Sequence, residues 1–157
     1  MTDSLDTPFG VYVHVPFCRA RCDYCAFATW TDRGHLVARY LAACRSQAAA
    51  AAPLLPPVTS VFVGGGTPSL VPAADLLDVV AVLPLAPGAE VTVEANPDDV
   101  SADLLAAYRQ GGVTRLSLGV QSMVPAVLAA LGAATTPPAC SAPPGPPTGP
   151  ACPSTWI

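Results

Sequence analysis

Four short runs rich in β-branched residues alternate with segments of helical periodicity, and this alternation limits the fold of the chain more than any other feature. A strand, a helix and a second strand in succession are typical of a βαβ unit, because parallel strands need a long crossover connection. The chain is therefore expected to be an α/β protein with a parallel sheet and about four βα units. The expected strands are residues 11–15, 58–63, 91–95 and 113–119, and the expected helices are residues 35–52, 72–83, 102–110 and 125–131.

Local signals predict where these helices begin and end. Ser101 is expected to be an N-cap, because its hydroxyl can accept a hydrogen bond from an unpaired N–H of the first turn. Pro72 is expected to be the first residue of the second helix, where the missing N–H of proline has no partner to lose. Gly111 and Gly112 are expected to end the third helix.

The composition changes abruptly near residue 132. No charged residue follows Arg115, and eight of the 19 prolines lie from Pro137 onward. Residues 133–157 are mostly Pro, Ala, Gly, Thr and Ser without periodicity, which predicts a disordered Pro/Ala-rich tail of low complexity. The chain is thus interpreted as a core domain over residues 1–132 followed by a tail over residues 133–157.

The charge of the chain argues against a nucleic-acid partner. Its seven basic residues, all Arg, are outnumbered by 11 acidic residues, so the formal net charge is -4, whereas phosphate binding needs clustered cations. The uncharged stretch at residues 116–139 is interrupted by Pro and Gly and does not predict a membrane span. The N-terminus contains Asp3 and Asp6 and lacks a signal-peptide pattern, so a cytoplasmic location is expected.

Cys18, Cys22 and Cys25 form a C-x3-C-x2-C motif directly after the first expected strand. Without an export signal, such cysteines are read as thiols or metal ligands before disulfides. Three thiolates in one loop can ligate an iron–sulfur cluster and leave one iron without a protein ligand. A zinc site that lacks its fourth ligand and three unrelated thiols are the alternatives. The pattern favours the cluster, because zinc sites usually show a second C-x2-C pair or nearby His.

Three further features follow the ends of expected strands, where α/β proteins place their ligand sites. Glycines 64–66 follow the second strand; their backbone can approach a ligand closely, although a tight turn would also explain them. This run lacks the Lys-Ser/Thr ending of a phosphate loop, which disfavours a nucleoside triphosphate. Glu94 ends the third strand and Gln121 ends the fourth, and each needs either a ligand or a polar partner within the protein.

Together these motifs resemble those of the radical S-adenosylmethionine (SAM) superfamily. The resemblance covers residues 10–132 and is greatest for the branch that contains oxygen-independent coproporphyrinogen III oxidase and the HemW heme chaperones, HemW above all. It implies that the chain is the N-terminal portion of a partial TIM-type barrel. The segments that carry it are YVHVPFCRARCDYC at 12–25, GGGTP at 64–68, VEANP at 93–97 and RLSLGVQ at 115–121.

The resemblance also implies which residues bind the cofactors. Cys18, Cys22 and Cys25 would ligate a [4Fe-4S] cluster whose open iron binds SAM, and reduction of the cluster would split the SAM sulfonium to give a radical. His14 also matches a family histidine, with simple packing in the barrel as an equal alternative. No catalytic residue is assigned. The residues implied to contact SAM are Tyr12, Tyr24, Gly65, Gly66, Thr67, Glu94 and Gln121.

One position favours the heme chaperone over the oxidase. The oxidase branch typically carries a further Cys two places beyond the third ligand, and this chain has Phe27 there. A HemW-type protein would also bind heme or porphyrin, would take electrons from a reductant protein and would deliver heme to membrane respiratory enzymes. The alternative is an oxygen-independent coproporphyrinogen III oxidase, which performs a radical oxidative decarboxylation in porphyrin biosynthesis.

A third hypothesis is that the chain is a truncated or frameshifted product without biochemical function. The family continues beyond the equivalent of Gly132 with an Arg, a nearby His and further βα units, whereas here Ala133 begins the Pro/Ala-rich tail. Under this hypothesis the barrel is incomplete and buries less apolar area than a whole one, so its stability is expected to be marginal.

Overall fold

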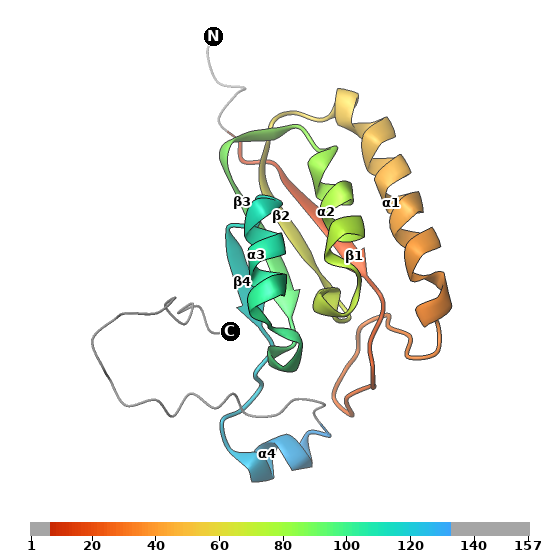
Figure 1. The fold of residues 1–157 in the computed structure, drawn as a ribbon, viewed down its shortest axis with the longest axis vertical. Coiled ribbons are helices and arrows are strands. Elements are labelled where there is room, and N and C mark those ends of the chain that lie inside the picture. The colour runs from red at the N-terminus through yellow and green to blue at the C-terminus, as the bar shows by residue number, and fades with distance from the viewer. Residues whose placement is uncertain (1–6, 133–157) are drawn as a thin grey trace, which may run out of the picture.

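The computed structural model describes residues 7–132, whose strands form a parallel sheet (Figure 1). The strands are β1 (Gly10–Val15), β2 (Val58–Gly65), β3 (Leu85–Ala95) and β4 (Arg115–Leu118). The α-helices are α1 (Val37–Ala51), α2 (Ala73–Ala81), α3 (Ala102–Gln110) and α4 (Pro125–Ala130). Short 3-10 turns lie at η1 (Gly34–Leu36), η2 (Ala52–Leu54), η3 (Pro68–Leu70) and η4 (Pro97–Asp99).

The four strands pair in their sequence order, β1-β2-β3-β4, and every pair is parallel. The helices α1, α2 and α3 all lie on the same face of the sheet (Figure 1). A doubly wound sheet would reverse its strand order and carry helices on both faces, whereas a barrel wall has this sequential order with helices outside. The structure confirms the predicted α/β class with four βα units, arranged as part of a barrel.

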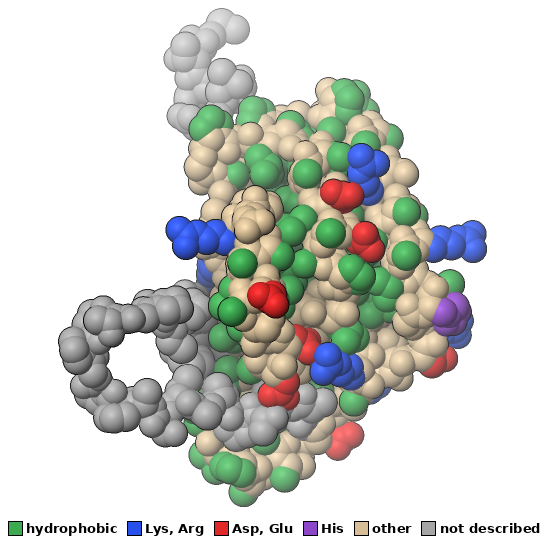
Figure 2. Space-filling view, viewed as in Figure 1, with side chains coloured by type: hydrophobic (Ala, Val, Ile, Leu, Met, Phe, Trp, Pro, Cys, Tyr) green, Lys and Arg blue, Asp and Glu red, His purple; other side chains and the backbone are tan. Residues whose placement is uncertain are grey.

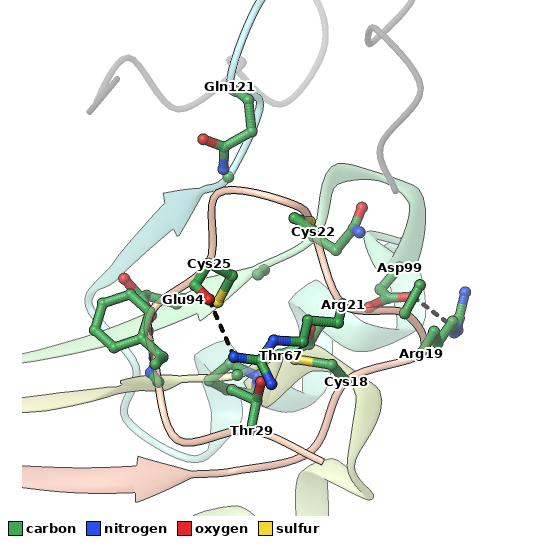
Figure 3. A pocket seen from close by; sticks show the side chains of 18 of the residues that line it. Cys18, Arg19, Arg21, Cys22, Cys25, Thr29, Thr67, Glu94, Asp99 and Gln121 are labelled. Atoms are coloured by element: carbon green, nitrogen blue, oxygen red, sulfur yellow. Dashed lines mark hydrogen bonds and ion pairs between the residues drawn. The ribbon is translucent and has the colours of Figure 1, made fainter. Parts of the chain in front are cut away.

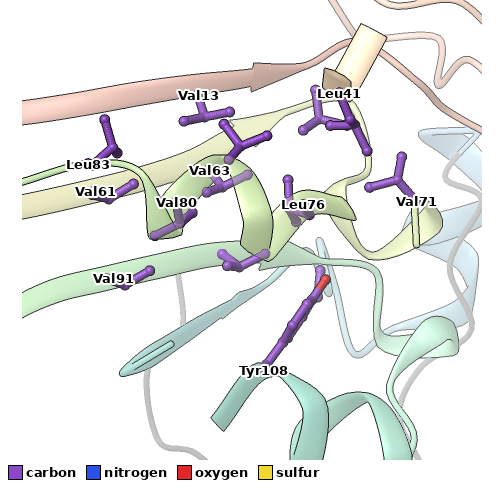
Figure 4. Close-up of a cluster of buried hydrophobic side chains, with 14 of the residues drawn as sticks. Val13, Leu41, Val61, Val63, Val71, Leu76, Val80, Leu83, Val91 and Tyr108 are labelled. Atoms are coloured by element: carbon purple, nitrogen blue, oxygen red, sulfur yellow. The ribbon is translucent and has the colours of Figure 1, made fainter. Parts of the chain in front are cut away.

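Apolar side chains hold the helices on the sheet (Figure 4). Leu41 of α1, Leu76 of α2 and Tyr108 of α3 are buried against the valines of the sheet. Each fully buried side chain of this kind contributes about 1.5–3 kcal/mol, so this layer is the main source of stability. The buried cluster consists of Val13, Val15, Phe17, Leu41, Val58, Val61, Val63, Val71, Leu76, Val79, Val80, Leu83, Val91, Val93, Ala95, Tyr108 and Leu116.

The opposite face of the sheet carries polar and aromatic side chains, because successive side chains of a strand point to opposite faces. Tyr12 stacks on Phe62 with 6.2 Å between the ring centroids and lies beside His14. Partial burial, and after it the charge of Glu94, raises the pKa of Tyr12. Glu94 shares this polar face, because a Cβ on Gly64 would meet both its carboxylate and the ring of Phe62.

Most elements differ from the sequence-based prediction by one or more residues, and the differences matter most at α2, β3 and β4. The helix α2 begins at Ala73, and Pro72 is its N-cap with a ψ of 123°, an extended value outside the helical range. The strand β3 begins at Leu85, earlier than predicted, and its pairing with β2 is irregular there. The strand β4 is shorter than predicted and spans Arg115–Leu118.

The predicted ends of α3 are confirmed. Ser101 is the N-cap, and its Oγ accepts a hydrogen bond from the backbone N–H of Leu104 at 3.1 Å. Gly111 is the C-cap, and Gly112 has a φ of 85°, in the left-handed region that favours glycine after a helix. The tail predicted at residues 133–157 lies outside the described residues.

The surface adds little to the stability of this fold. Charged side chains of both signs are scattered among the described residues on the face drawn in Figure 2, without a large patch of one sign. The exposed ion pairs Arg33–Asp32 and Arg115–Glu90 have N–O distances of 3.3 and 3.2 Å, and such pairs contribute about 0–1 kcal/mol. Across residues 7–132, no helix combines the length and the apolar content needed to cross a membrane.

We expect the substitution Leu76→Ala to lower the free energy of unfolding by about 2–4 kcal/mol, because it leaves a cavity between α2 and the sheet. Leu54→Ala is the matched control, since Leu76 is 0% exposed and Leu54 is 85% exposed. Urea denaturation followed by circular dichroism measures both variants. Equal losses in the two variants would show that the apolar layer does not govern stability.

Candidate functional site

Nearly all residues predicted to bind cofactors line one pocket of about 350 Å³ at the carboxyl ends of the strands (Figure 3). Its walls are the loop after β1, the turn after β2, the end of β3 with η4, and the segment after β4. The volume lies within the range of small-molecule sites. Tyr12 is the one predicted residue outside the lining, and those within it are Cys18, Cys22, Cys25, Tyr24, Gly65, Gly66, Thr67, Glu94 and Gln121.

The loop that carries the cysteines is closed at its base by backbone pairing between Phe17 and Trp30. The N–H of Trp30 donates to the carbonyl that precedes Phe17 at 2.8 Å, and the N–H of Cys18 donates to the carbonyl of Trp30 at 3.1 Å. Inside the loop, the N–H of Cys25 donates to the carbonyl of Cys22 at 3.0 Å. The loop therefore leaves the sheet at Phe17 and returns to it at Trp30, where backbone hydrogen bonds close it.

The three cysteines of the loop are free thiols, each partly exposed. Within residues 7–132, no three Cys, His, Asp or Glu side chains are grouped closely enough to hold a metal ion in this conformation. The three thiols nevertheless share one loop and one pocket, and they are the donor set that an iron–sulfur cluster uses. Metal binding commonly orders its own ligands, so these residues fit a cluster when the loop draws the thiols together.

The glycine turn, residues 64–67 at the end of β2, needs glycine because neighbouring groups of the protein leave no room for side chains there. Gly65 has a φ of 114°, and a Cβ at this position would collide with the ring of His14. A Cβ on Gly66 would lie 2.6 Å from the carbonyl oxygen of Phe17 and 3.0 Å from Sγ of Cys18. The tight-turn explanation therefore applies to these glycines, and the same turn lines the pocket with its backbone.

Hydrogen bonds fasten this turn to the base of the cysteine loop. The N–H of Gly66 donates to the carbonyl of Val15 at 2.7 Å, and the N–H of Thr67 donates to the carbonyl of Phe17 at 2.8 Å. The hydroxyl of Thr67 donates to Sγ of Cys18 at 3.6 Å. The first cysteine and the glycine turn consequently form one connected unit.

Glu94 reaches the same unit from the end of β3. Its Oε2 accepts a hydrogen bond from the backbone N–H of Gly65 at 3.1 Å, drawn as a dashed line in Figure 3. This bond fixes the side chain and uses one of its two carboxylate oxygens. A partly buried carboxylate needs compensation for its lost hydration, so Glu94 can accept a hydrogen bond from a cationic group in the pocket.

Gln121 adopts a strained backbone conformation at the pocket. Its φ of 63° is the only positive φ at a non-glycine residue among those described, and the left-handed region costs such residues about 1–2 kcal/mol. Its side-chain nitrogen lies over Gly119, where a Cβ would be only 3.2 Å away. Strain of this kind gathers at functional sites, and the sequence contains no signal that would have predicted it.

Tyr24 lies in the cysteine loop and lines the pocket. Partial burial, and after it the neighbouring Cys22 thiol, raises the pKa of Tyr24 to about 12. Like that of an ordinary tyrosine, its hydroxyl keeps its proton at neutral pH, and it is a hydrogen-bond donor beside the thiols of Cys22 and Cys25.

His14 and Tyr12 are bonded to each other on the open face of the sheet. His14 Nε2 lies 3.0 Å from the carbonyl oxygen of Ala28, and its Nδ1 lies 3.0 Å from the hydroxyl of Tyr12. A carbonyl can only accept, so Nε2 carries the hydrogen and Nδ1 accepts from the tyrosine. Both ring nitrogens of His14 thus have partners within the protein, as the packing alternative expects. The hydrogen bond to Ala28 also holds the end of the cysteine loop.

The structure brings further residues to the pocket that the sequence analysis did not select. Arg19 approaches Asp99 with 2.8 Å between Nη2 and Oδ1 (Figure 3). The hydroxyl of Thr29 is buried without a hydrogen-bond partner. Asp99, an acidic residue after the third strand, and Arg19, next to the first cysteine, could have been chosen from the sequence as candidates for the pocket. Nothing in the sequence distinguished Thr29.

Comparison with known proteins gives consistent results. Two heme chaperones named HemW, from Mycobacterium tuberculosis strain H37Rv and from Escherichia coli, are 50% and 42% identical to this chain over 133 and 134 residues. These matches cover 79% and 80% of this chain but 34% and 35% of the two relatives. An oxygen-independent coproporphyrinogen III oxidase from Bradyrhizobium diazoefficiens is 38% identical over 130 residues, which are 78% of this chain and 29% of that protein. The chain thus spans about a third of the length of the curated relatives it matches.

The fold is also similar to a solved structure. Coproporphyrinogen III oxidase (HemN) from Escherichia coli, described as a radical SAM enzyme, superposes with a TM-score of 0.68 and 29% identity. The similarity covers 80% of this chain and 30% of that one. The model of the radical SAM superfamily matches residues 12–139. With its barrel-type sheet and its cysteine pocket, the chain belongs to the radical SAM superfamily.

Proposed function

We propose that this chain is the cofactor-binding part of a HemW-type heme chaperone, which holds a [4Fe-4S] cluster and SAM and handles heme. The observation that carries the proposal is one pocket in which the cysteine loop, the glycine turn, Glu94 and Gln121 meet. Four separate strands supply these groups, so their meeting is a property of the tertiary structure. The chain spans about a third of its relatives, so the activity and partners of the whole protein are part of the proposal.

Cys18, Cys22 and Cys25 would hold the cluster, because they are the free thiols of the pocket. Three protein ligands leave one iron for a small ligand, and the bound cluster would supply an electron to the SAM sulfonium. Arg21 lies between the cysteines in the sequence and lines the pocket. Its positive charge would offset part of the negative charge that thiolate ligands bring.

Other groups of the pocket would bind SAM itself. The second oxygen of Glu94 would accept a hydrogen bond from the amino group of SAM, while the N–H of Gly65 holds the first oxygen. The backbone of Gly66 and the side chain of Thr67 would face its methionine part, because that turn lies against Cys18. Gln121 and Tyr24 would close the sides of the pocket. Tyr12 lies outside this lining, so its predicted role has less support.

Two observations favour a heme chaperone over a coproporphyrinogen III oxidase. The HemW relatives are up to 50% identical to this chain, against 38% for the oxidase of Bradyrhizobium diazoefficiens. Phe27, which is 62% exposed at the pocket, also stands where the oxidase branch typically has a fourth cysteine.

The reductant protein, the membrane respiratory enzymes as heme recipients and the cytoplasmic location remain predictions. The oxidase is the second candidate, supported by the similarity to HemN.

Anaerobic reconstitution with iron and sulfide tests the cluster. We expect the 157-residue chain to take up about four irons and to give a cluster signal in electron paramagnetic resonance after reduction. The variants Cys18→Ala, Cys22→Ala and Cys25→Ala should each lose most of this iron. Cys44→Ala is the control, because Cys44 lies on α1 outside the pocket. Full iron uptake by any of the three loop variants would contradict the assignment of that ligand.

Equilibrium dialysis with labelled SAM tests the role of Glu94. We expect Glu94→Ala to weaken SAM binding by the reconstituted chain about 10- to 100-fold, as the loss of a hydrogen bond to a charged group does. Glu90→Gln is the matched control, because Glu90 lies on the same strand but pairs with Arg115 at the surface. Unchanged binding by the Glu94 variant would contradict its proposed contact.

Enzyme assays and heme titration separate the two candidate functions. The chain should be extended with the remaining part of the Mycobacterium tuberculosis HemW relative and incubated anaerobically with coproporphyrinogen III, SAM and a reductant. We expect no protoporphyrinogen, and a Soret band when heme is added. Formation of protoporphyrinogen would contradict the chaperone assignment and favour the oxidase.

A further inference from the structure

An ion pair joins the cysteine loop to the segment after β3. Nη2 of Arg19 lies 2.8 Å from Oδ1 of Asp99, and Figure 3 shows the two side chains meeting at one end of the pocket. Arg19 directly follows Cys18, and Asp99 ends η4. The pair therefore connects two walls of the pocket that are distant in sequence.

The two partners differ in exposure. The side chain of Asp99 is only 4% exposed, whereas that of Arg19 is 65% exposed. A buried carboxylate is destabilising unless a cation or hydrogen bonds compensate it. Oδ1 of Asp99 accepts no hydrogen bond of good geometry, so the charge of Arg19 is the compensation on that side.

Hydrogen bonds hold the acidic partner in place. Oδ2 of Asp99 accepts from the hydroxyl of Ser69 at 2.7 Å, and the Ser69 oxygen in turn accepts from the N–H of Asn96 at 3.0 Å. Ser69 belongs to η3, directly after the glycine turn. The charge of Asp99 also contributes, after burial, to the pKa of about 12 of Tyr108 in α3. Through Ser69, Asp99 is thus held between η3 and η4.

On the cysteine side of the pair, the hydrogen bonds at the base of the loop reach as far as Cys18. At Cys18 the loop is held by a backbone bond to Trp30 and by the long contact between the Thr67 hydroxyl and Sγ of Cys18. Beyond Cys18 the chain turns away from the sheet toward Cys22 (Figure 3). An anchor at residue 19 is therefore placed where the loop leaves the sheet.

We propose that Arg19 and Asp99 are a positioning pair, in which the fixed carboxylate holds the start of the cysteine loop and so sets the place of Cys18 in the pocket. This inference rests on the proposed function, because it assigns the pair a role in presenting a cluster ligand. It concerns neither a metal ligand nor a group that contacts SAM. The pair acts through the loop it holds.

Alkylation of the apo chain by iodoacetamide tests the pair without any cofactor. Cleavage after arginine places Cys18, the Cys22–Cys25 pair and Cys44 in separate peptides, so mass spectrometry follows each rate. We expect Arg19→Gln to raise the alkylation rate of Cys18 about fivefold relative to Cys44, because a released loop exposes its first thiol. Arg19→Lys should restore most of the protection. Asp32→Asn is the control, since it breaks an exposed ion pair elsewhere.

A double-mutant cycle separates positioning from a general loss of stability. Asp99→Asn keeps an acceptor for Ser69 but removes the charge, so in that background Arg19→Gln should have no further effect on Cys18. Circular dichroism establishes that each variant is folded. If Asp99→Asn does not fold, the comparison of Arg19→Gln with Arg19→Lys decides alone, because position 19 is mostly exposed.

Two results would overturn the positioning role. One is an alkylation rate of Cys18 in Arg19→Gln equal to that of the unsubstituted chain. The other is the same increase with and without the Asp99 charge. Iron uptake after reconstitution is a separate readout and should fall by more than half in Arg19→Gln. If the unsubstituted chain takes up no iron, the proposed function fails, while the alkylation rates still decide whether the pair holds the loop.

Discussion

Parallel pairing of four strands in sequence order is the constraint on which the rest of the structure depends. Parallel strands place all their carboxyl ends at one edge of the sheet, so the segments after β1, β2, β3 and β4 meet there. The pairing itself is sustained by the valine layer between the sheet and α1 to α3. A change in this layer would therefore disturb the pocket without touching any residue that lines it.

Hydrogen bonds and an ion pair between neighbouring segments hold the walls of the pocket together. The glycine turn donates its N–H groups to the backbone at the base of the cysteine loop. Glu94 binds the N–H of Gly65, and Asp99 binds Arg19. Each connection joins segments that follow different strands. A ligand bound between these segments would consequently contact walls that are already joined to one another by hydrogen bonds and an ion pair.

The predictable parts of the fold were those governed by local chemistry. Ser101 capped α3 because a hydroxyl at that place serves the first turn of any helix. The boundaries of β3 and β4 were harder, since strand ends depend on which neighbour is available for pairing. Pro72 was misplaced by one residue, because its fixed φ suits both the first helical position and the extended N-cap that it occupies here.

The sequence by itself determined the α/β class, the cysteine loop and nine of the 22 residues that line the pocket. The class follows from periodicity and the cysteine loop from spacing, which are local properties, whereas several of the pocket residues follow from the resemblance of the motifs to those of the radical SAM superfamily. Only the tertiary structure decided that Tyr12 turns to Phe62 and His14, that the glycines accommodate His14 and Cys18, and that Arg19 meets Asp99. The physical reason is that, apart from the bond between Tyr12 and His14 within β1, these contacts join different strands or loops, and their distances are set by packing rather than by sequence separation.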